Sequence, residues 1–135
     1  MKKPILLITG AVANSDENDI QTYKKLVEMC GKYNCEISSP LETMKFKGTD
    51  SERYIRAMEL VQNAKLVIAE MSTPSVGQGM ELQKAIDLDV PIIIIVKKGK
   101  TVSKMILGSK VNKVIFYNDT KDLEEKLEMV LKEVI

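Results

Sequence analysis

The sequence predicts an α/β fold: a three-layer, doubly wound, flavodoxin-like parallel sheet of five strands in the order 2-1-3-4-5. Short runs that are apolar throughout, such as Pro4–Thr9 and Pro91–Val96, alternate with segments of helical hydrophobic spacing. Strands that are apolar on both faces are typical of parallel sheets with helices on both sides. A length of 135 residues with 44% hydrophobic content suits one domain, residues 1–135.

Each predicted element rests on its own hydrophobic pattern. Pro4–Thr9 is a continuous apolar run that ends at Gly10, as expected of a strand buried on both faces. Asp16–Gly31 carries apolar residues at helical spacing, and a glycine commonly follows the end of a helix. The other expected elements are a short strand at Cys35–Ser38, a loop at Ser39–Thr49, helices at Asp50–Asn63, Val76–Leu88, Thr101–Leu107 and Asp119–Val134, and strands at Lys65–Ala69, Pro91–Val96 and Lys113–Tyr117.

The same spacing indicates which helix faces turn inward. In the predicted helix at Asp50–Asn63 the inward residues are Tyr54, Ile55, Met58 and Val61. In the closing helix they are Leu123, Leu127, Val130, Leu131 and Val134.

Composition excludes several kinds of chemistry. The chain has no histidine, which rules out Ser-His-Asp, Cys-His and imidazole acid–base catalysis. Cys30 and Cys35 are too few for a zinc site of about four ligands, so we expect structural thiols and no metal. A net charge of +1, no basic tract and short apolar runs favour a cytoplasmic protein without a nucleic-acid polymer or a membrane as partner.

The fold prediction also says where a ligand binds. Open parallel sheets bind ligands beyond the carboxyl ends of the strands, where the winding reverses. In the predicted order this point lies between the first and third strands, which continue into the loops Gly10–Ser15 and Glu70–Gly79. We therefore expect these two loops to face each other across a ligand site.

The second of these loops contains the residues most suited to chemistry. Ser75 offers a hydroxyl, and Gly77 and Gly79 allow a close backbone approach or a positive φ. The amides at the start of the following helix can hold an anion such as a phosphate. Glu81 comes next and could attack an electrophilic carbon; the plain structural alternative is a solvated glutamate near a helix N-terminus. Neither a G-x-G-x-x-G nor a Walker signature is present.

At this point the residues match a known motif. PSVGQGMEL, residues 74–82, resembles the PSxGxGxEL motif of the nucleoside 2-deoxyribosyltransferase superfamily, and the nearest branch is the 2'-deoxynucleoside 5'-phosphate N-hydrolases. The strand VPIIIIV follows the family pattern, and Val102–Gly108 resembles its later S-x-M-I-x-G segment. The resemblance extends over nearly the whole chain.

The resemblance implies a retaining glycosidase mechanism without a cofactor. Glu81 would attack C1' of a deoxyribose, displace the base and form a deoxyribosyl-enzyme ester that water hydrolyses. An adjacent carboxylate also stabilises the oxocarbenium-like transition state.

The resemblance also implies a homodimer with shared sites that binds a small-molecule deoxynucleotide or deoxynucleoside. The loop serine and glycines would hold the 5'-phosphate, while Ser103 and Met105 would reach into the neighbouring subunit's pocket. Taken without the resemblance, these two residues are a helix cap and a core methionine. The implied substrate-binding residues are Gly10, Ala11, Val12, Ser75, Gly77, Gly79, Ser103, Lys104 and Met105.

The chain departs from the family pattern in its first loop and strand. The loop arginine of the family falls at Ala13, so a phosphate needs another cation, for which Lys104, Arg53 and Arg56 are available. The family tyrosine near the end of the first strand matches Leu7.

A third departure concerns the acid. The family carries a helix aspartate that orients the nucleophile or helps protonate the leaving base, and here that position is Ala57. Glu59 lies about 200° further around the helix and cannot simply replace it. The acids that remain as alternative proton donors are Asp16, Asp19, Asp50 and Glu70.

Three functions stay open from the sequence. The leading one is hydrolysis of 2'-deoxynucleoside 5'-monophosphates, which the retained glutamate and glycines favour. The others are deoxyribosyl transfer between bases on unphosphorylated nucleosides and non-catalytic nucleotide binding. Flavin binding fits the fold, but an aromatic content of 4% leaves few partners for ring stacking.

Overall fold

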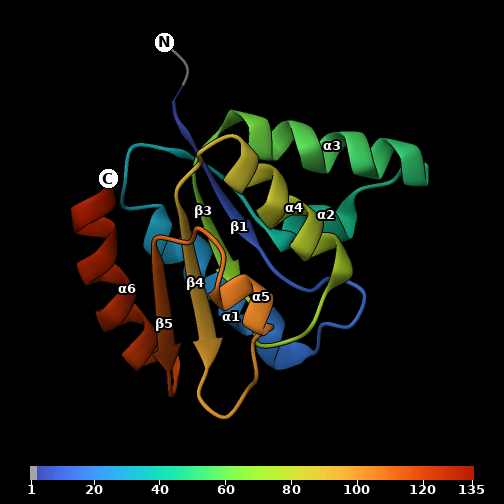
Figure 1. Ribbon diagram of the computed structural model, residues 1–135. Coiled ribbons are helices and arrows are strands. Elements are labelled where there is room, and N and C mark those ends of the chain that lie inside the picture. Colours follow the sequence, from blue (N-terminus) through green and yellow to red (C-terminus); the bar gives the residue numbers. More distant parts are fainter. Residues whose placement is uncertain (1–2) are drawn as a thin grey trace.

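The computed structural model describes residues 3–135 and, within them, one parallel sheet of five strands. The strand order is β2-β1-β3-β4-β5, and helices cover both faces of the sheet (Figure 1). The predicted doubly wound, flavodoxin-like α/β architecture is therefore confirmed. The predicted span of 1–135 includes Met1 and Lys2, which lie outside the described residues.

The expected strands and helices follow one another in the predicted order. Their ends agree with the predicted ones within one residue, except at the start of the helix expected at Thr101–Leu107, which begins at Lys104. No helix within residues 3–135 is long and apolar enough to span a lipid bilayer. The described elements are β1 (Ile5–Thr9), α1 (Glu17–Cys30), β2 (Glu36–Ser38), α2 (Pro40–Lys45), α3 (Asp50–Asn63), β3 (Ala64–Glu70), α4 (Val76–Asp87), β4 (Ile92–Lys97), α5 (Lys104–Leu107), β5 (Lys113–Tyr117) and α6 (Thr120–Val134).

Capping side chains determine where the helices near the sheet's carboxyl edge begin. The Asp16 carboxylate accepts the Asp19 N–H at 2.8 Å, and Asp19 accepts the Asp16 N–H in return at 3.0 Å. Ser75 Oγ accepts the Gln78 N–H at 3.3 Å. Because such bonds satisfy N–H groups that the first turn of a helix leaves without partners, they anchor the loops before α1 and α4.

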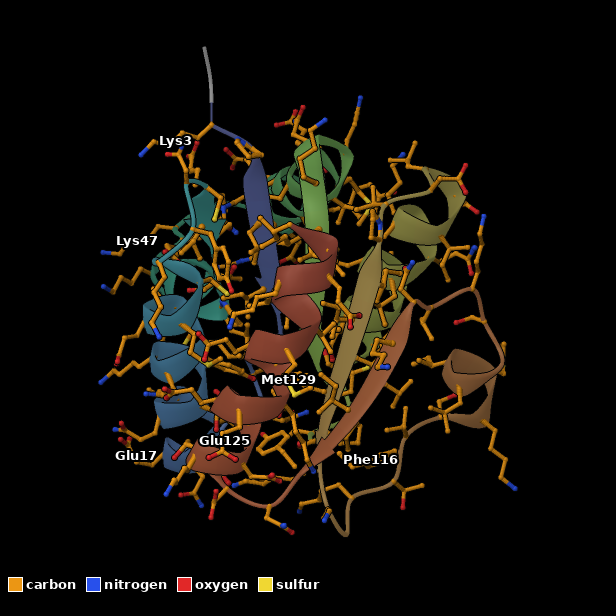
Figure 2. The ribbon with its side chains drawn as sticks, turned by 90° about the vertical axis from the view of Figure 1, so that its left-hand side faces the viewer. Lys3, Glu17, Lys47, Phe116, Glu125 and Met129 are labelled. Atoms are coloured by element: carbon orange, nitrogen blue, oxygen red, sulfur yellow. The ribbon has the colours of Figure 1, made fainter. Side chains whose placement is uncertain are left out.

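The sheet separates two apolar layers. α1 and α6 lie side by side over one face (Figure 2), where Leu26 and Leu127 are fully buried. α3 and α4 cover the other face, where Val61 and Ala85 are fully buried. Residues Ile92–Val96 of β4 are 0% exposed and supply side chains to both layers. Burial of each such side chain contributes about 1.5–3 kcal/mol.

Helix α2 corrects the loop expected at Ser39–Thr49. Ser39 Oγ accepts the Leu41 N–H at 3.2 Å, and the Ser39 N–H donates to the Glu42 carboxylate at 3.0 Å. Pro40 occupies the first turn, where its missing N–H costs nothing. A helix of 6 residues is too short to display an amphipathic period, so this capping pattern was its one signal in the sequence.

Three side chains expected to face inward are exposed. Tyr54 is 54% and Ile55 52% exposed, because the first turns of α3 extend beyond the edge of the sheet (Figure 1). Val134 is 41% exposed at the end of α6. The other apolar residues predicted to be inward on α6 are buried, as is Val61 on α3.

Candidate active site

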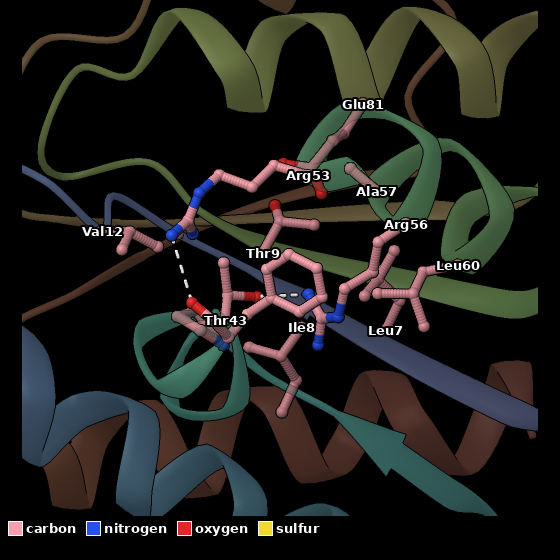
Figure 3. Close-up of a pocket in the computed structure, with 13 residues that line it drawn as sticks. Leu7, Ile8, Thr9, Val12, Thr43, Arg53, Arg56, Ala57, Leu60 and Glu81 are labelled. Carbon is pink, nitrogen blue, oxygen red and sulfur yellow. Dashed lines mark hydrogen bonds between the residues drawn. The ribbon is translucent and has the colours of Figure 1, made fainter. Parts of the chain in front are cut away.

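A cavity of about 100 Å³ opens at the carboxyl end of β1, between the sheet and helices α2, α3 and α4 (Figure 3). The winding of the sheet reverses between β1 and β3, so the cavity lies where open parallel sheets bind ligands. The residues that line it are Leu7, Ile8, Thr9, Gly10, Val12, Pro40, Thr43, Phe46, Arg53, Arg56, Ala57, Leu60 and Glu81.

Glu81 enters this cavity from the second turn of α4. Its side chain is half-buried, and burial raises the pKa of Glu81 to about 7, an effect that the positive charge of Arg56 partly offsets. This environment differs from that of the solvated glutamate considered as the structural alternative. A carboxylate that ionises near neutral pH in a partly dehydrated site suits a nucleophile or an acid–base group.

Two arginines of α3 form the wall across the cavity from α4. Arg56 donates to Thr43 Oγ1 at 2.9 Å, and Arg53 donates to the Phe46 carbonyl at 3.1 Å. Their guanidinium carbons lie 5.3 and 5.4 Å from the centroid of the Phe46 ring, within cation–π range. No salt bridge joins either arginine to Glu81 within the described residues, although all three side chains line the cavity.

Ala57 lies in the same wall, near Glu81 (Figure 3). The position that matches the family aspartate therefore does face the cavity, but it carries only a methyl group. No group of three acidic or cysteine side chains within residues 3–135 is arranged to hold a metal ion. The acids considered as alternative proton donors are not among the lining residues; they are Asp16, Asp19, Asp50 and Glu70.

Glu70 instead holds the β3–α4 loop. It is 2% exposed, accepts the Ser72 N–H at 2.5 Å and accepts the Tyr117 hydroxyl. Burial raises the pKa of this carboxyl group above its ordinary value. Ser72 Oγ in turn accepts the Lys97 N–H at 2.8 Å. This network attaches the start of the loop to the ends of β4 and β5.

Gln78 ties α4 to the end of β1. Its side chain is 1% exposed, and Nε2 donates to Thr9 Oγ1 at 2.9 Å and to the Glu70 carbonyl at 3.0 Å. Its Oε1 has no hydrogen-bond partner within the described residues. Because Thr9 lines the cavity, these buried bonds determine how α4 and Glu81 sit above the strand.

The loop after β1 contributes to the cavity in part. Gly10 and Val12 line it, whereas Ala11 is 1% exposed and its carbonyl accepts the Tyr23 hydroxyl at 2.7 Å. A Cβ at Gly10 would lie 2.5 Å from Tyr23. The glycine is therefore required by the packing of this ring.

Ser75 and Ser103 line a second cavity of about 360 Å³, between the β3–α4 and β4–α5 loops. The Ser75 hydroxyl caps α4, as described above. Ser103 occupies the N-cap position of α5, as the structural alternative expected, but its side chain makes no capping bond. Within a single chain, the two serines predicted to bind phosphate do not line the cavity of Glu81.

The remaining predicted residues lie in open surroundings. Gly77 and Gly79 are inside α4 without a positive φ, so that part of the expectation is wrong. A Cβ on either would meet no atom within 4 Å, which leaves room for a ligand to approach the backbone. Lys104 is exposed on α5, and Met105, at 86% exposed, is not a core methionine.

Comparisons with known proteins agree with the motif, although no family model matches the chain. A Methanosarcina mazei protein with the provisional name 2'-deoxynucleoside 5'-phosphate N-hydrolase 1 is 26% identical over 131 residues, which covers 91% of this chain and 81% of that protein. The 5-hydroxymethyl-dUMP N-hydrolase of Rattus norvegicus is 28% identical over 109 residues, 74% of this chain and 66% of that protein. The resemblance to the nucleoside 2-deoxyribosyltransferase superfamily is confirmed.

Solved structures with the same fold include two enzymes that act on nucleosides or nucleotides. The CMP N-glycosidase BcmB of Clostridium botulinum has a TM-score of 0.74 at 19% identity, over 93% of this chain and 98% of that chain. A 2-deoxyribosyltransferase of Bacillus psychrosaccharolyticus has a TM-score of 0.70 at 15% identity, over 89% of this chain and 90% of that chain.

The sequence did not predict the wall of the cavity that α2 and the residue after it provide. Thr43 and Phe46 orient both arginines, yet they fell in a segment expected to be a loop. The Ser39–Glu42 cap with an intervening proline could have located α2. Nothing in the sequence indicated that α2 packs beside α3, because that contact is set by the tertiary fold.

Proposed function

We propose that this protein is an N-glycosidase that hydrolyses the base–deoxyribose bond of 2'-deoxynucleoside 5'-monophosphates through a covalent glutamyl-deoxyribosyl intermediate. One observation carries the proposal. Glu81, half-buried and with its pKa raised to about 7, lies in the cavity at the switch point of the sheet, where the motif resemblance puts the nucleophile. The relatives named as nucleotide N-hydrolases support the same class of reaction.

The reaction balances with water as the only co-substrate. A Glu81 oxygen bonds to C1' while the bond from C1' to the base nitrogen breaks and its electron pair leaves with the base. The adjacent carboxylate stabilises the positive charge that develops on the sugar. A water oxygen then bonds to C1', the ester bond returns its electrons to Glu81, and a water proton goes to the base. The products are the free base and 2-deoxyribose 5-phosphate.

Arg53 supplies the cation for the 5'-phosphate in this proposal. The family loop arginine is absent at Ala13, but Figure 3 draws the Arg53 guanidinium beside Val12 of the same loop, and both line the cavity. The bond to the Phe46 carbonyl occupies one of five N–H donors, which leaves others for phosphate oxygens. Lys104, another of the cations considered, is on α5 and does not line this cavity.

A homodimer with shared sites would complete the pocket. Ligand sites usually enclose about 300–1,000 Å³, so a cavity of about 100 Å³ needs further walls to hold a nucleotide. The Ser103 hydroxyl caps nothing, and Met105 is 86% exposed. Val76 and Met80 on α4 are 86% and 49% exposed, and they offer an apolar surface on which a second copy can bring its Ser103–Met105 segment to the cavity.

Release of free base from the four 2'-deoxynucleoside 5'-monophosphates, compared with the ribonucleotides, tests the proposal. We expect release from at least one deoxynucleotide and a loss of about a thousandfold or more in Glu81→Gln, as for removal of a covalent nucleophile. Glu59→Gln, at an exposed glutamate of α3, is the matched control and should keep full activity. A wild-type protein that releases no base over hours would remove the proposal.

Deoxyribosyl transfer on unphosphorylated nucleosides is the second candidate, and the missing arginine at Ala13 favours it. The test adds an acceptor base to a 2'-deoxynucleoside and looks for a new nucleoside. If the rate of transfer to the acceptor base exceeds the rate of hydrolysis of every 2'-deoxynucleoside 5'-monophosphate, the protein is a deoxyribosyltransferase and the N-glycosidase proposal is wrong. A non-catalytic nucleotide-binding module would instead gain thermal stability from nucleotides and yield no product.

A further inference from the structure

Among residues 3–135 of one chain, no residue that lines the cavity is an acid free to protonate a departing base. Its charged residues are Arg53, Arg56 and Glu81, and the hydroxyls in its walls are those of Thr9 and Thr43. Glu81 is engaged with C1' in the proposed reaction, and aliphatic hydroxyls are too weakly acidic to give up a proton. A base that leaves this site therefore departs as an anion, and another group must stabilise its negative charge in the proton's place.

Arg56 is the cation best placed to do so. It lines the cavity together with Glu81, and its positive charge lowers the pKa of that carboxyl group. It precedes Ala57, where a methyl group stands at the position of the family aspartate. The Phe46 ring at 5.3 Å and the Thr43 hydroxyl at 2.9 Å orient the guanidinium before any ligand arrives, as electrostatic catalysis requires.

The guanidinium also retains free donors. Of its five N–H groups, one donates to Thr43, and no other hydrogen bond or salt bridge engages Arg56 within residues 3–135. A departing pyrimidine spreads its negative charge over N1 and the neighbouring carbonyl oxygen O2. Those two atoms are spaced much like the oxygens of a carboxylate, which an arginine fork binds through two parallel N–H bonds.

We propose that Arg56 binds the leaving base as an electrophile in place of a proton-donating acid, and that the protein therefore prefers pyrimidine 2'-deoxynucleotides whose base is a stable anion. This inference rests on the proposed function. The electron pair of the C1'–N1 bond moves onto N1 and O2, and the guanidinium holds that oxygen. The anion takes its proton afterwards, from the water that hydrolyses the glycosyl-enzyme. Adenine is disfavoured, because it leaves readily only after its ring is protonated.

Base release from dUMP, 5-fluoro-dUMP and 5-formyl-dUMP, whose bases are increasingly acidic at N1, tests the inference. Arg56→Met should lower kcat/KM for dUMP by about a hundredfold or more, in the range of a lost oxyanion donor. The loss for 5-formyl-dUMP should be at least about tenfold smaller, because a better anion needs less help. Arg56→Lys keeps the charge without the fork and should recover part of the loss. Arg53→Gln is the matched control, because Arg53 packs over the same Phe46 ring. It should lower kcat/KM for all three substrates by the same factor.

An equal loss for all three substrates in Arg56→Met, with an unchanged melting temperature, overturns the inference and leaves the N-glycosidase proposal standing. A wild type that releases no base from any of them removes both. Should Arg56→Met fail to fold, the wild type decides through its pH profile. The rate should rise through about pH 7 as Glu81 ionises and then stay level, since no acid must remain protonated. A fall in rate above about pH 8 while the protein stays folded overturns the inference.

Discussion

Replacement of Glu81 by glutamine should stabilise the fold at alkaline pH. Burial raises the pKa of this carboxyl group from its ordinary value of 4.5 to about 7. Above pH 7 the folded protein therefore carries a poorly solvated charge, which the unfolded chain carries in water. Glutamine removes the charge and has nearly the same shape, so the packing around the cavity changes little.

The size of the effect follows from the pKa. A tenfold change in the acid dissociation constant corresponds to about 1.4 kcal/mol, so the difference between 4.5 and about 7 corresponds to about 3 kcal/mol at most. Because Glu81 is only half-buried and solvent screens part of its charge, we expect a gain of roughly 1–3 kcal/mol in the free energy of unfolding at pH 8.

The raised pKa also determines how the free energy of unfolding varies with pH. A carboxyl group whose pKa is higher in the folded state binds its proton more tightly there, so folding is favoured at low pH and this advantage is lost as pH rises through 4.5 to about 7. Below about pH 4 the glutamate is protonated in both states. Wild type and Glu81→Gln should be equally stable there, and the difference between them should grow until about pH 7 and then level off.

Urea unfolding of both proteins, followed by circular dichroism across this pH range, measures the difference. Glu59→Gln serves as the control, and an exposed substitution of this kind should change the free energy of unfolding by less than about 0.5 kcal/mol at every pH. If Glu81→Gln were less stable than wild type at pH 8, or if the difference did not vary with pH, the carboxyl group would be solvated. The case for a nucleophile in a partly dehydrated cavity would then fail.

Three further predictions concern the supports of the site. Gly10→Ala should lower the free energy of unfolding by about 1–3 kcal/mol in urea, because the new Cβ would lie 2.5 Å from Tyr23. Ser39→Ala should cost about 1 kcal/mol through the lost cap of α2, and base release should fall with it, since that helix orients the arginine wall. Met105→Ala should leave stability within about 0.5 kcal/mol of wild type, as the side chain is 86% exposed. Alone it should release base poorly, because Met105 would line the partner's pocket. Mixed with Glu81→Gln, it should regain up to about a quarter of wild-type activity in hybrid dimers, and no recovery would argue against shared sites.

The hydrophobic pattern predicted most of the fold because parallel strands buried on both faces need apolar residues at every position. The run at Ile92–Val96 has no polar interruption and is 0% exposed along its whole length. The pattern failed where burial depends on the extent of a neighbouring element. Tyr54 and Ile55 have helical spacing, but the turns that carry them extend past the sheet and leave them exposed.

The sequence predicted where the site lies, because ligands of open parallel sheets bind beyond the carboxyl ends of the strands where the winding reverses, here β1 and β3. Gly10 and Val12 of the first loop line one cavity with Glu81, but no residue of the second loop, Glu70–Gly79, lines it. The position of Ser75 in another cavity was not foreseen. Motif residues that are adjacent in sequence separate in space because a helix turns successive side chains about 100° apart.

The sequence by itself determined the alternation of strands and helices and the placement of a carboxylate just beyond the exit of β3. The tertiary structure alone decided how that carboxylate behaves. Its pKa depends on burial beneath α3 and on the charge of Arg56, and Arg56 is oriented by Thr43 from a helix earlier in the chain. Burial and electrostatic fields arise from elements that only folding brings together, and no local pattern of residues encodes them.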